Sequence, residues 1–232
     1  AAKLAAIEAL GAHAVVADAF DAEALRRAVA EARPEVVIHQ LTDLPDVSDP
    51  AQMAVVREKN SRLRVEGTRN LMAAAKAARI PVRGYVSCIT DCPYEGAVSP
   101  QRTAWVAQAL FDMGCYEISL GDTIGQATPE RLDKTLQAVL DSVPASALAG
   151  HYHDTNQRAL ENISLSLGHG IRVFDAAVGG LGGCPYAPGA KGNVATEAVA
   201  ALMQSQGFET GLDLIKLEKA AQMAKGLVHE TA

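Results

Sequence analysis

Short apolar runs alternate with longer helical patterns along this chain of 232 residues, and this alternation limits the fold more than any other feature. Six strands are predicted at His13–Ala17, Glu35–His39, Gly84–Cys88, Cys115–Leu120, Ala147–His151 and Ile171–Asp175. Helices are predicted near Ala22–Ala32, Ala51–Ala78, Pro100–Met113, Pro129–Ser142, Asn156–Leu167, Ala195–Gln206 and Leu212–Gly226. Strands that alternate with long helices are typical of βα units and a parallel sheet. The sequence therefore predicts an α/β protein whose functional residues lie at the carboxyl ends of its strands.

Three of the helix starts carry a chemical signal. Asp21, Ser99 and Thr128 each stand directly before a predicted helix, and the last two are followed by proline. A short oxygen-bearing side chain at this position accepts a hydrogen bond from the first helical turn, and proline fits the first helical position. These residues are predicted N-caps.

Composition excludes some classes of function. The net charge is −6, and 49% of the residues are hydrophobic and 21% charged. An acidic chain without a dedicated basic face is not expected to bind nucleic acid. The first residues are interrupted by Gly11 and His13 and show no cleavage-site pattern, so neither a signal peptide nor a membrane span is expected. The four cysteines form no CxxC pair and no zinc spacing, which favours reduced thiols in a cytoplasmic protein.

The sequence His151-Tyr152-His153-Asp154 closes the fifth predicted strand. Alternate residues of a strand point to the same face, so both imidazoles can converge on one point. Imidazole binds divalent transition metals, and an Asn or Asp oxygen suits a harder ion such as Mg²⁺ or Mn²⁺. The alternative is two surface histidines at a strand end, with Asp154 capping the next helix.

Asp122 follows the predicted strand Cys115–Leu120 in the sequence Gly121-Asp122-Thr123. A carboxylate at this strand end could orient a base or a substrate hydroxyl. Asp122 could equally be a turn residue that bonds its own backbone.

A glycine-rich loop, GLGGCPYAPGAKGN, runs from Gly180 to Asn193 and contains Cys184. Such a loop could bind phosphate, form a structural turn or act as a hinged lid. The motifs GxGxxG and GxxxxGK[ST] are both missing, which disfavours phosphate binding. A thiol between glycines and proline is an uncommon place for an inert buried cysteine.

From about Arg83 onward the chain closely resembles the C-terminal half of hydroxymethylglutaryl-CoA lyases. The motifs that carry the resemblance are GYVSC with CPYEG (residues 84–96), MGCYEISLGDTIG (113–125), GHYHDT (150–155) and VGGLGGCPYAPGAKGNVATE (178–197). These lyases are metal-dependent TIM barrels that split 3-hydroxy-3-methylglutaryl-CoA, an acyl-CoA, into acetyl-CoA and acetoacetate. The resemblance implies half of a TIM-type (β/α) barrel over residues 83–232.

The resemblance also implies roles for individual residues. It assigns His151, His153 and Asn193 as ligands of a divalent cation, Mg²⁺ or Mn²⁺. It matches Asp122 to a catalytic acidic residue, Cys184 to the catalytic thiol, and His151 to the residue that helps to remove the hydroxyl proton.

Residues 1–82 instead resemble an interior piece of an extended short-chain dehydrogenase or NAD-dependent epimerase. The matching segments are LGAHAVVADAFDAEALRRAV, PEVVIHQLTDLP and EGTRNLMAAAKAARI. This resemblance implies a Rossmann-like βα fragment without the glycine fingerprint or the Tyr-xxx-Lys pair. The predicted architecture is therefore a chimera that joins this fragment to the half barrel.

Two alternatives to a carbon–carbon lyase stay open. The lyases carry an Arg-Asp pair on their first barrel strand, whose Asp completes the metal site, and no Arg-Asp dipeptide occurs in this chain. The chain is therefore either a lyase whose missing half a partner supplies or an inactive α/β chimera with vestigial sites. A weaker alternative is an NAD(P)-binding oxidoreductase. The strands could close as an imperfect barrel or form an open sheet, and an open edge would allow a homodimer.

Overall fold

The computed structural model describes residues 2–37, 53–183 and 192–229. Contacts divide the chain into two compact units, Ala1–Val82 (unit 1) and Arg83–Ala232 (unit 2). The predicted join between two families also lies between residues 82 and 83, and the assignment of the two units to different families stays a prediction.

Unit 1 is helical in its described part. Its elements are α1 (Ala2–Ala9), α2 (Ala22–Ala32), α3 (Met53–Arg62), the π-helical turn η1 (Leu63–Gly67) and α4 (Thr68–Ala77). The prediction of one long helix over Ala51–Ala78 is therefore confirmed from Met53 to Ala77, with a π turn inside it, and α1 was not predicted.

The two strands predicted in unit 1 are wrong where the structure describes them. Residues 12–18 and 35–37 are not in strands, while His39 and its preceding residue lie outside the described part. Val15, Val16 and Val36 are exposed, with 55%, 79% and 71% of their surface accessible. An apolar run becomes a strand only when a neighbouring strand pairs with its backbone, and no such pairing is present in the described residues.

Helices α2 and α4 pack together in unit 1. Asp21 caps α2 by accepting a hydrogen bond from the backbone N–H of Ala24 at 2.9 Å, as predicted. Ala74 and Ala75 are buried on α4, and Asn70 donates to the carbonyl of Ala19 at 3.0 Å. Small residues thus let the two helices approach closely.

Unit 2 is built on a parallel four-stranded sheet. Its strands are β1 (Arg83–Ser87), β4 (Glu117–Asp122), β5 (Leu148–Tyr152) and β6 (Val173–Asp175), in the spatial order β1-β4-β5-β6. All neighbours run parallel, so the last four predicted strands are confirmed. Each strand lies beside the next one along this sheet, with β1 and β6 at the two edges.

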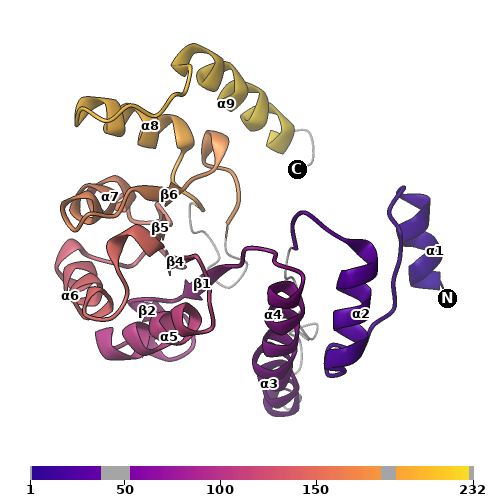
Figure 1. Cartoon of the computed structure of the whole chain (residues 1–232). Coiled ribbons are helices and arrows are strands. Elements are labelled where there is room, and N and C mark those ends of the chain that lie inside the picture. The colour runs from indigo at the N-terminus through magenta and orange to yellow at the C-terminus, as the bar shows by residue number, and fades with distance from the viewer. Residues whose placement is uncertain (1, 38–52, 184–191, 230–232) are drawn as a thin grey trace. The chain divides into compact units, whose positions relative to one another are not determined.

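Helices α5 (Pro100–Asp112), α6 (Pro129–Leu140) and α7 (Ala159–Gly168) follow the strands and cover one side of the sheet (Figure 1). After β6 come the 3₁₀ turn η3 (Val178–Gly180), α8 (Thr196–Ser205) and α9 (Leu214–His229), which pack on one another. A second 3₁₀ turn, η2 (Ala145–Ala147), precedes β5. The five predicted helices are confirmed to within a few residues. Ser99 and Thr128 accept from the backbone N–H of Arg102 and Arg131, so both predicted N-caps are confirmed. A small antiparallel pair, β2 (Asp91–Cys92) and β3 (Gly96–Ala97), was not predicted.

The two faces of the sheet differ because side chains alternate along each strand. One face, the helix face, carries the buried apolar side chains of Val86, Ile118, Leu120, Leu148 and Tyr152. A Cβ atom at Gly84 would lie 3.1 Å from Leu110 of α5, which shows that this face packs on the helices.

The opposite face, the concave face, carries Arg83, Glu117, Ser119, His151 and Asp175. In a flat sheet the edge strands β1 and β6 would lie about 14 Å apart, three spacings of about 4.8 Å. Yet Nη2 of Arg83 on β1 lies 2.9 Å from Oδ1 of Asp175 on β6. The sheet therefore curls towards this face.

Candidate metal and catalytic site

Two histidines lie together at the carboxyl end of β5. His151 ends the concave-face row of β5, and His153 follows two residues later, with ring centroids 5.5 Å apart. His153 is buried, with 9% of its surface accessible, and its Nδ1 has no hydrogen-bond partner in the described part of the chain. A buried polar atom without a partner is costly, so this nitrogen marks a place where a ligand would be stabilising.

Burial favours the neutral form of His153. Burial lowers the pKa of His153, and the neighbouring His151 lowers it further. A neutral imidazole is the form that binds a metal ion. The electrostatics of the site therefore favour ligation by His153.

Asn193 lies beside His153. The two residues form an isolated antiparallel bridge, and the amide N–H of Asp154 donates to the carbonyl of Gly192 at 2.9 Å. Nδ2 of Asn193 donates to the carbonyl of Leu181 at 2.9 Å, which leaves its amide oxygen as the atom that could bind a cation. The structure thus places His151 near His153, and Asn193 beside the backbone of His153.

This donor set fits a divalent cation. Two imidazoles and an amide oxygen are a mixed nitrogen and oxygen set that suits Mn²⁺ and, with added water, Mg²⁺. Within the described ranges, no group of three or more His, Cys, Asp or Glu residues could hold a metal ion. A three-ligand site among these residues therefore depends on Asn193.

Asp175 is a site residue that the sequence analysis missed. It lies on β6 directly opposite His151 in the strand register, and its Oδ2 lies 3.2 Å from Nδ1 of His151. Ser119 donates to the same oxygen at 2.8 Å. Arg83 donates to both carboxylate oxygens, at 3.1 and 2.9 Å. One carboxylate thereby joins β1, β4, β5 and β6.

These contacts govern the charge of Asp175. Burial by itself would raise the pKa of the carboxyl, but hydrogen bonds from His151, Arg83 and Ser119 hold it well below its usual range. Arg83 also bonds Oε1 of Glu117 at 2.5 Å and the hydroxyl of Tyr85. The concave face therefore holds two carboxylates around one guanidinium.

Asp122 does not join the histidines. Gly121, not Asp122, pairs with His151 in the register, so the side chain of Asp122 belongs to the helix face. Its two carboxylate oxygens accept the backbone N–H groups of Gln126 and Ala127 at 3.1 and 3.0 Å. Burial raises its pKa, and these hydrogen bonds offset part of the rise. The described geometry matches the turn role that the sequence left open.

Cys184 lies outside the described residues, but both ends of its loop are described. The hydrogen bond from Asn193 to Leu181 joins the two ends. Gly182 has a φ of +91°, and a Cβ there would lie 2.8 Å from Nδ2 of Asn193, so this position requires glycine. The base of the loop is thus closed beside His153.

No helix in the described part of the chain combines the length and the apolar character that crossing a membrane requires.

Comparison with known proteins shows the family of this chain. The family model described as HMGL-like matches residues 2–224. The chain belongs to the HMGL-like family. It is 50% identical over 161 residues to the cytoplasmic 3-hydroxy-3-methylglutaryl-CoA lyase of Mus musculus. This match covers 69% of this chain and 47% of that protein. It is 55% identical over 147 residues to the mitochondrial hydroxymethylglutaryl-CoA lyase of Gallus gallus, covering 63% of this chain and 49% of that protein.

Among solved structures, the HMG-CoA lyase from Brucella melitensis matches with a TM-score of 0.74 and 46% identity, over 87% of this chain and 70% of that one. This HMGL-like chain spans about half the length of the curated relatives it matches. Because the family match begins at residue 2, it also extends over unit 1, which the sequence motifs placed outside the family. These comparisons do not show the predicted likeness of unit 1 to short-chain dehydrogenases, and that assignment stays a prediction.

Proposed function

We propose that this HMGL-like protein is a metal-dependent carbon–carbon lyase that acts on 3-hydroxy-3-methylglutaryl-CoA and releases acetyl-CoA and acetoacetate. One observation supports the proposal: at the carboxyl end of β5 the imidazole of His151 lies near that of His153, and Asn193 bridges to the backbone of His153. The names of the relatives support the substrate class.

His151, His153 and Asn193 would hold the cation, which we propose to be Mg²⁺ or Mn²⁺. When bound, it would acidify the tertiary hydroxyl of the substrate and stabilise negative charge as the carbon–carbon bond breaks.

Two protons then have to move. We propose that His151 assists removal of the hydroxyl proton by holding the cation that would acidify the hydroxyl, and that this proton leaves to water, so that the hydroxyl oxygen becomes the ketone of acetoacetate. The electron pair of the breaking bond passes to the acetyl-CoA fragment as an enolate. The thiol of Cys184 then gives its proton to the enolate carbon, which completes acetyl-CoA.

A catalytic role for Asp122 would require a change in its hydrogen bonds. The resemblance matches it to a catalytic acidic residue, but its carboxylate accepts hydrogen bonds from the backbone N–H groups of Gln126 and Ala127. To reach a substrate it would have to release both hydrogen bonds. As described, it holds the segment between β4 and α6.

Three further assignments belong to the proposal. A homodimer is proposed, because β1 and β6 are the edge strands of the sheet in the described part of the chain and an edge strand can pair with a second chain. A cytoplasmic location and a dehydrogenase-like origin of unit 1 are also proposed, on sequence grounds.

The test is acetoacetate formation by the purified chain with 3-hydroxy-3-methylglutaryl-CoA and Mn²⁺ or Mg²⁺. We expect product, reduced about 10²–10⁴-fold by Cys184→Ala because a proton donor is lost. His153→Ala should abolish metal-dependent product. His169→Ala is the matched control, since His169 pairs with Asp133 at 2.6 Å, away from the site. Metal-dependent turnover that survives both site variants, or no turnover by the unaltered chain, contradicts the proposal, and the latter result supports the inactive chimera.

A further inference from the structure

The carboxylate of Asp175 is surrounded by donors from three other strands. Arg83 on β1 contributes two N–H groups, Ser119 on β4 its hydroxyl, and His151 on β5 its Nδ1. With side-chain exposures of 19% for Arg83 and 23% for Asp175, this ion pair is largely shielded from water. A shielded, doubly bonded pair holds its geometry better than an exposed one.

The chemistry of the carboxylate decides the tautomer of His151. An ionised carboxylate can only accept hydrogen bonds, so Nδ1 of His151 must carry the hydrogen in this contact. In a neutral imidazole the other nitrogen, Nε2, then keeps its lone pair. A metal-binding histidine is commonly fixed in this way by a carboxylate on its second nitrogen.

The neighbours of Asp175 explain why it keeps this orientation. Ser119 and His151 both bond Oδ2, while Arg83 bonds both oxygens, so rotation of the carboxylate would break contacts on every side. Arg83 is held in turn by Glu117 on the neighbouring strand. The chain of contacts therefore runs from Glu117 through Arg83 and Asp175 to the imidazole.

We propose that Asp175 is a positioning residue for His151: held by Arg83 and Ser119, it accepts the Nδ1–H of the imidazole and so leaves Nε2 available to a cation. The part of this inference that concerns the cation rests on the proposed function. The tautomer does not, and it can be measured in the metal-free chain.

The first measurement is the tautomer of His151, from the ¹⁵N chemical shifts of its ring nitrogens in the metal-free protein at a fixed pH of about 8, above the usual pKa of histidine. The signals are assigned by their loss in His151→Gln. We expect the Nδ1–H form in the unaltered chain. In Asp175→Asn we expect a mixture or the Nε2–H form, because an amide can donate as well as accept.

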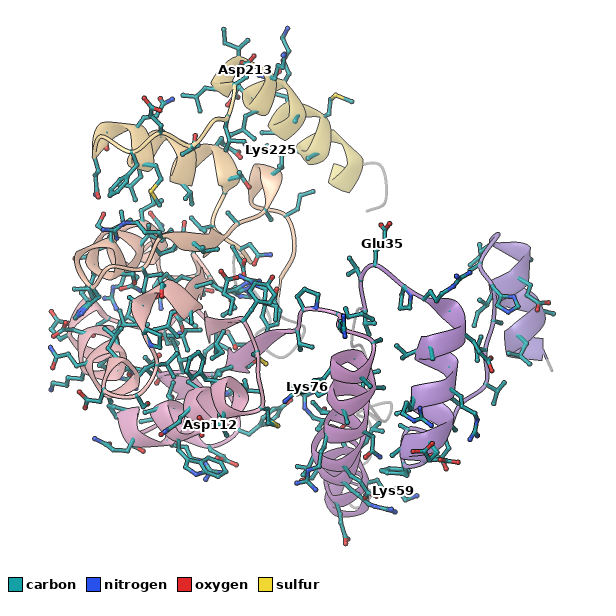
Figure 2. All side chains as sticks on the ribbon, viewed as in Figure 1. Glu35, Lys59, Lys76, Asp112, Asp213 and Lys225 are labelled. Carbon is teal, nitrogen blue, oxygen red and sulfur yellow. The ribbon has the colours of Figure 1, made fainter. Side chains whose placement is uncertain are left out.

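The second measurement is Mn²⁺ affinity by calorimetry. Asp175→Asn should weaken it about 10- to 100-fold, the usual effect of removing such a partner. Asp112→Asn is the matched control, because it makes the same chemical change at an exposed residue of α5 (labelled in Figure 2) and should change neither readout. Arg83→Lys keeps the charge but loses the paired N–H groups, so its effect should be smaller than that of Asp175→Asn.

The outcomes separate this inference from the proposed function. If Asp175→Asn folds and keeps the Nδ1–H form of His151, the inference is wrong. A fall in its melting temperature alone would show only a structural ion pair. If Asp175→Asn does not fold, the tautomer of the unaltered chain decides the inference, because a His151 that is mainly in the Nε2–H form there overturns it. If the unaltered chain binds no Mn²⁺, the proposed metal site fails, while the ring-nitrogen shifts still decide the role of Asp175.

Discussion

The two faces of the sheet in unit 2 are made by the same four strands and yet differ in almost every respect. The helix face buries Ile118, Leu120 and Leu148, each with 1% or less of its surface exposed. The concave face carries an ion-pair network and two histidines, and it leaves Tyr85 59% exposed. In each strand a single step along the chain passes from one face to the other. Residues of the apolar core and residues of the candidate site therefore alternate along each strand.

Replacing a leucine of the helix face should have the largest effect on stability. Leu120→Ala should lower the free energy of unfolding by about 2–5 kcal/mol, because it removes buried methyl groups and leaves a cavity. Urea unfolding followed by circular dichroism measures the change. Mn²⁺ affinity of the folded variant should be unchanged, and a large loss of affinity would show that the two faces are not independent.

A smaller loss should follow from Tyr152→Phe, also on the helix face. Ser166 of α7 gives its hydrogen to the carbonyl of Asn162, so the hydroxyl of Tyr152 is the donor in its 2.8 Å contact with Ser166. Losing one buried hydrogen bond costs about 1 kcal/mol. Tyr85→Phe is the control on the concave face and should cost less, since Tyr85 is exposed. Equal losses of unfolding free energy in the two variants would contradict the expected difference between the two faces.

Glu197 tests whether polar contacts beyond the sheet add to stability. Its Oε2 accepts the N–H of Gly179 at 3.0 Å, and its Oε1 lies 3.5 Å from Nζ of Lys225 on α9 (labelled in Figure 2). Desolvation opposes ionisation, but hydrogen bonds from its own backbone N–H, Gly179 and Lys225 lower its pKa below the ordinary 4.5.

A lowered carboxyl pKa contributes stability above the unfolded value, and this contribution is lost as the pH falls through the folded value. Glu197→Gln should therefore lower the melting temperature near neutral pH. The corresponding loss in the free energy of unfolding should be below about 1 kcal/mol. The difference from the unaltered chain should shrink below pH 4.5. Thermal unfolding at several pH values measures it, and a difference that grows on acidification would contradict the assignment.

The smallest effect is expected for Val173→Ala on the concave face. Val173 is apolar like Leu120, but 41% of its surface is exposed. Exposed substitutions usually change the free energy of unfolding by less than about 0.5 kcal/mol. Urea unfolding beside Leu120→Ala gives the direct comparison. A loss above 1 kcal/mol would mean that the concave face is covered in solution.

Much of unit 2 could be predicted from the sequence because each local signal agrees with the tertiary structure. Apolar runs became strands where a neighbouring strand could pair with them, and Ser99 and Thr128 became caps. The His151–His153 pair followed from a spacing of two at a strand end. The face of the sheet to which Asp122 belongs was harder to predict, because only the register shows that Gly121, and not Asp122, pairs with His151.

The misses also have physical causes. Asp175 is a single carboxylate at the end of the last predicted strand, and only the position of β6 beside β5 reveals its partner. The same strand-end signal that drew attention to Asp122 could have found it. In unit 1, the valine-rich segment at residues 13–17 has strand-like composition, but composition cannot supply a backbone partner.

The Arg83–Asp175 contact also has a consequence for how unit 2 folds. Its two residues are 92 positions apart in the chain, and the contact joins the first and last strands of the sheet. Closing so long a loop costs entropy that is recovered only after the intervening βα units have docked. The contact should therefore form after the rate-limiting step, so that Arg83→Gln accelerates unfolding and leaves the refolding rate nearly unchanged. Stopped-flow measurement of both rates would show whether this ion pair forms only after the strands have assembled.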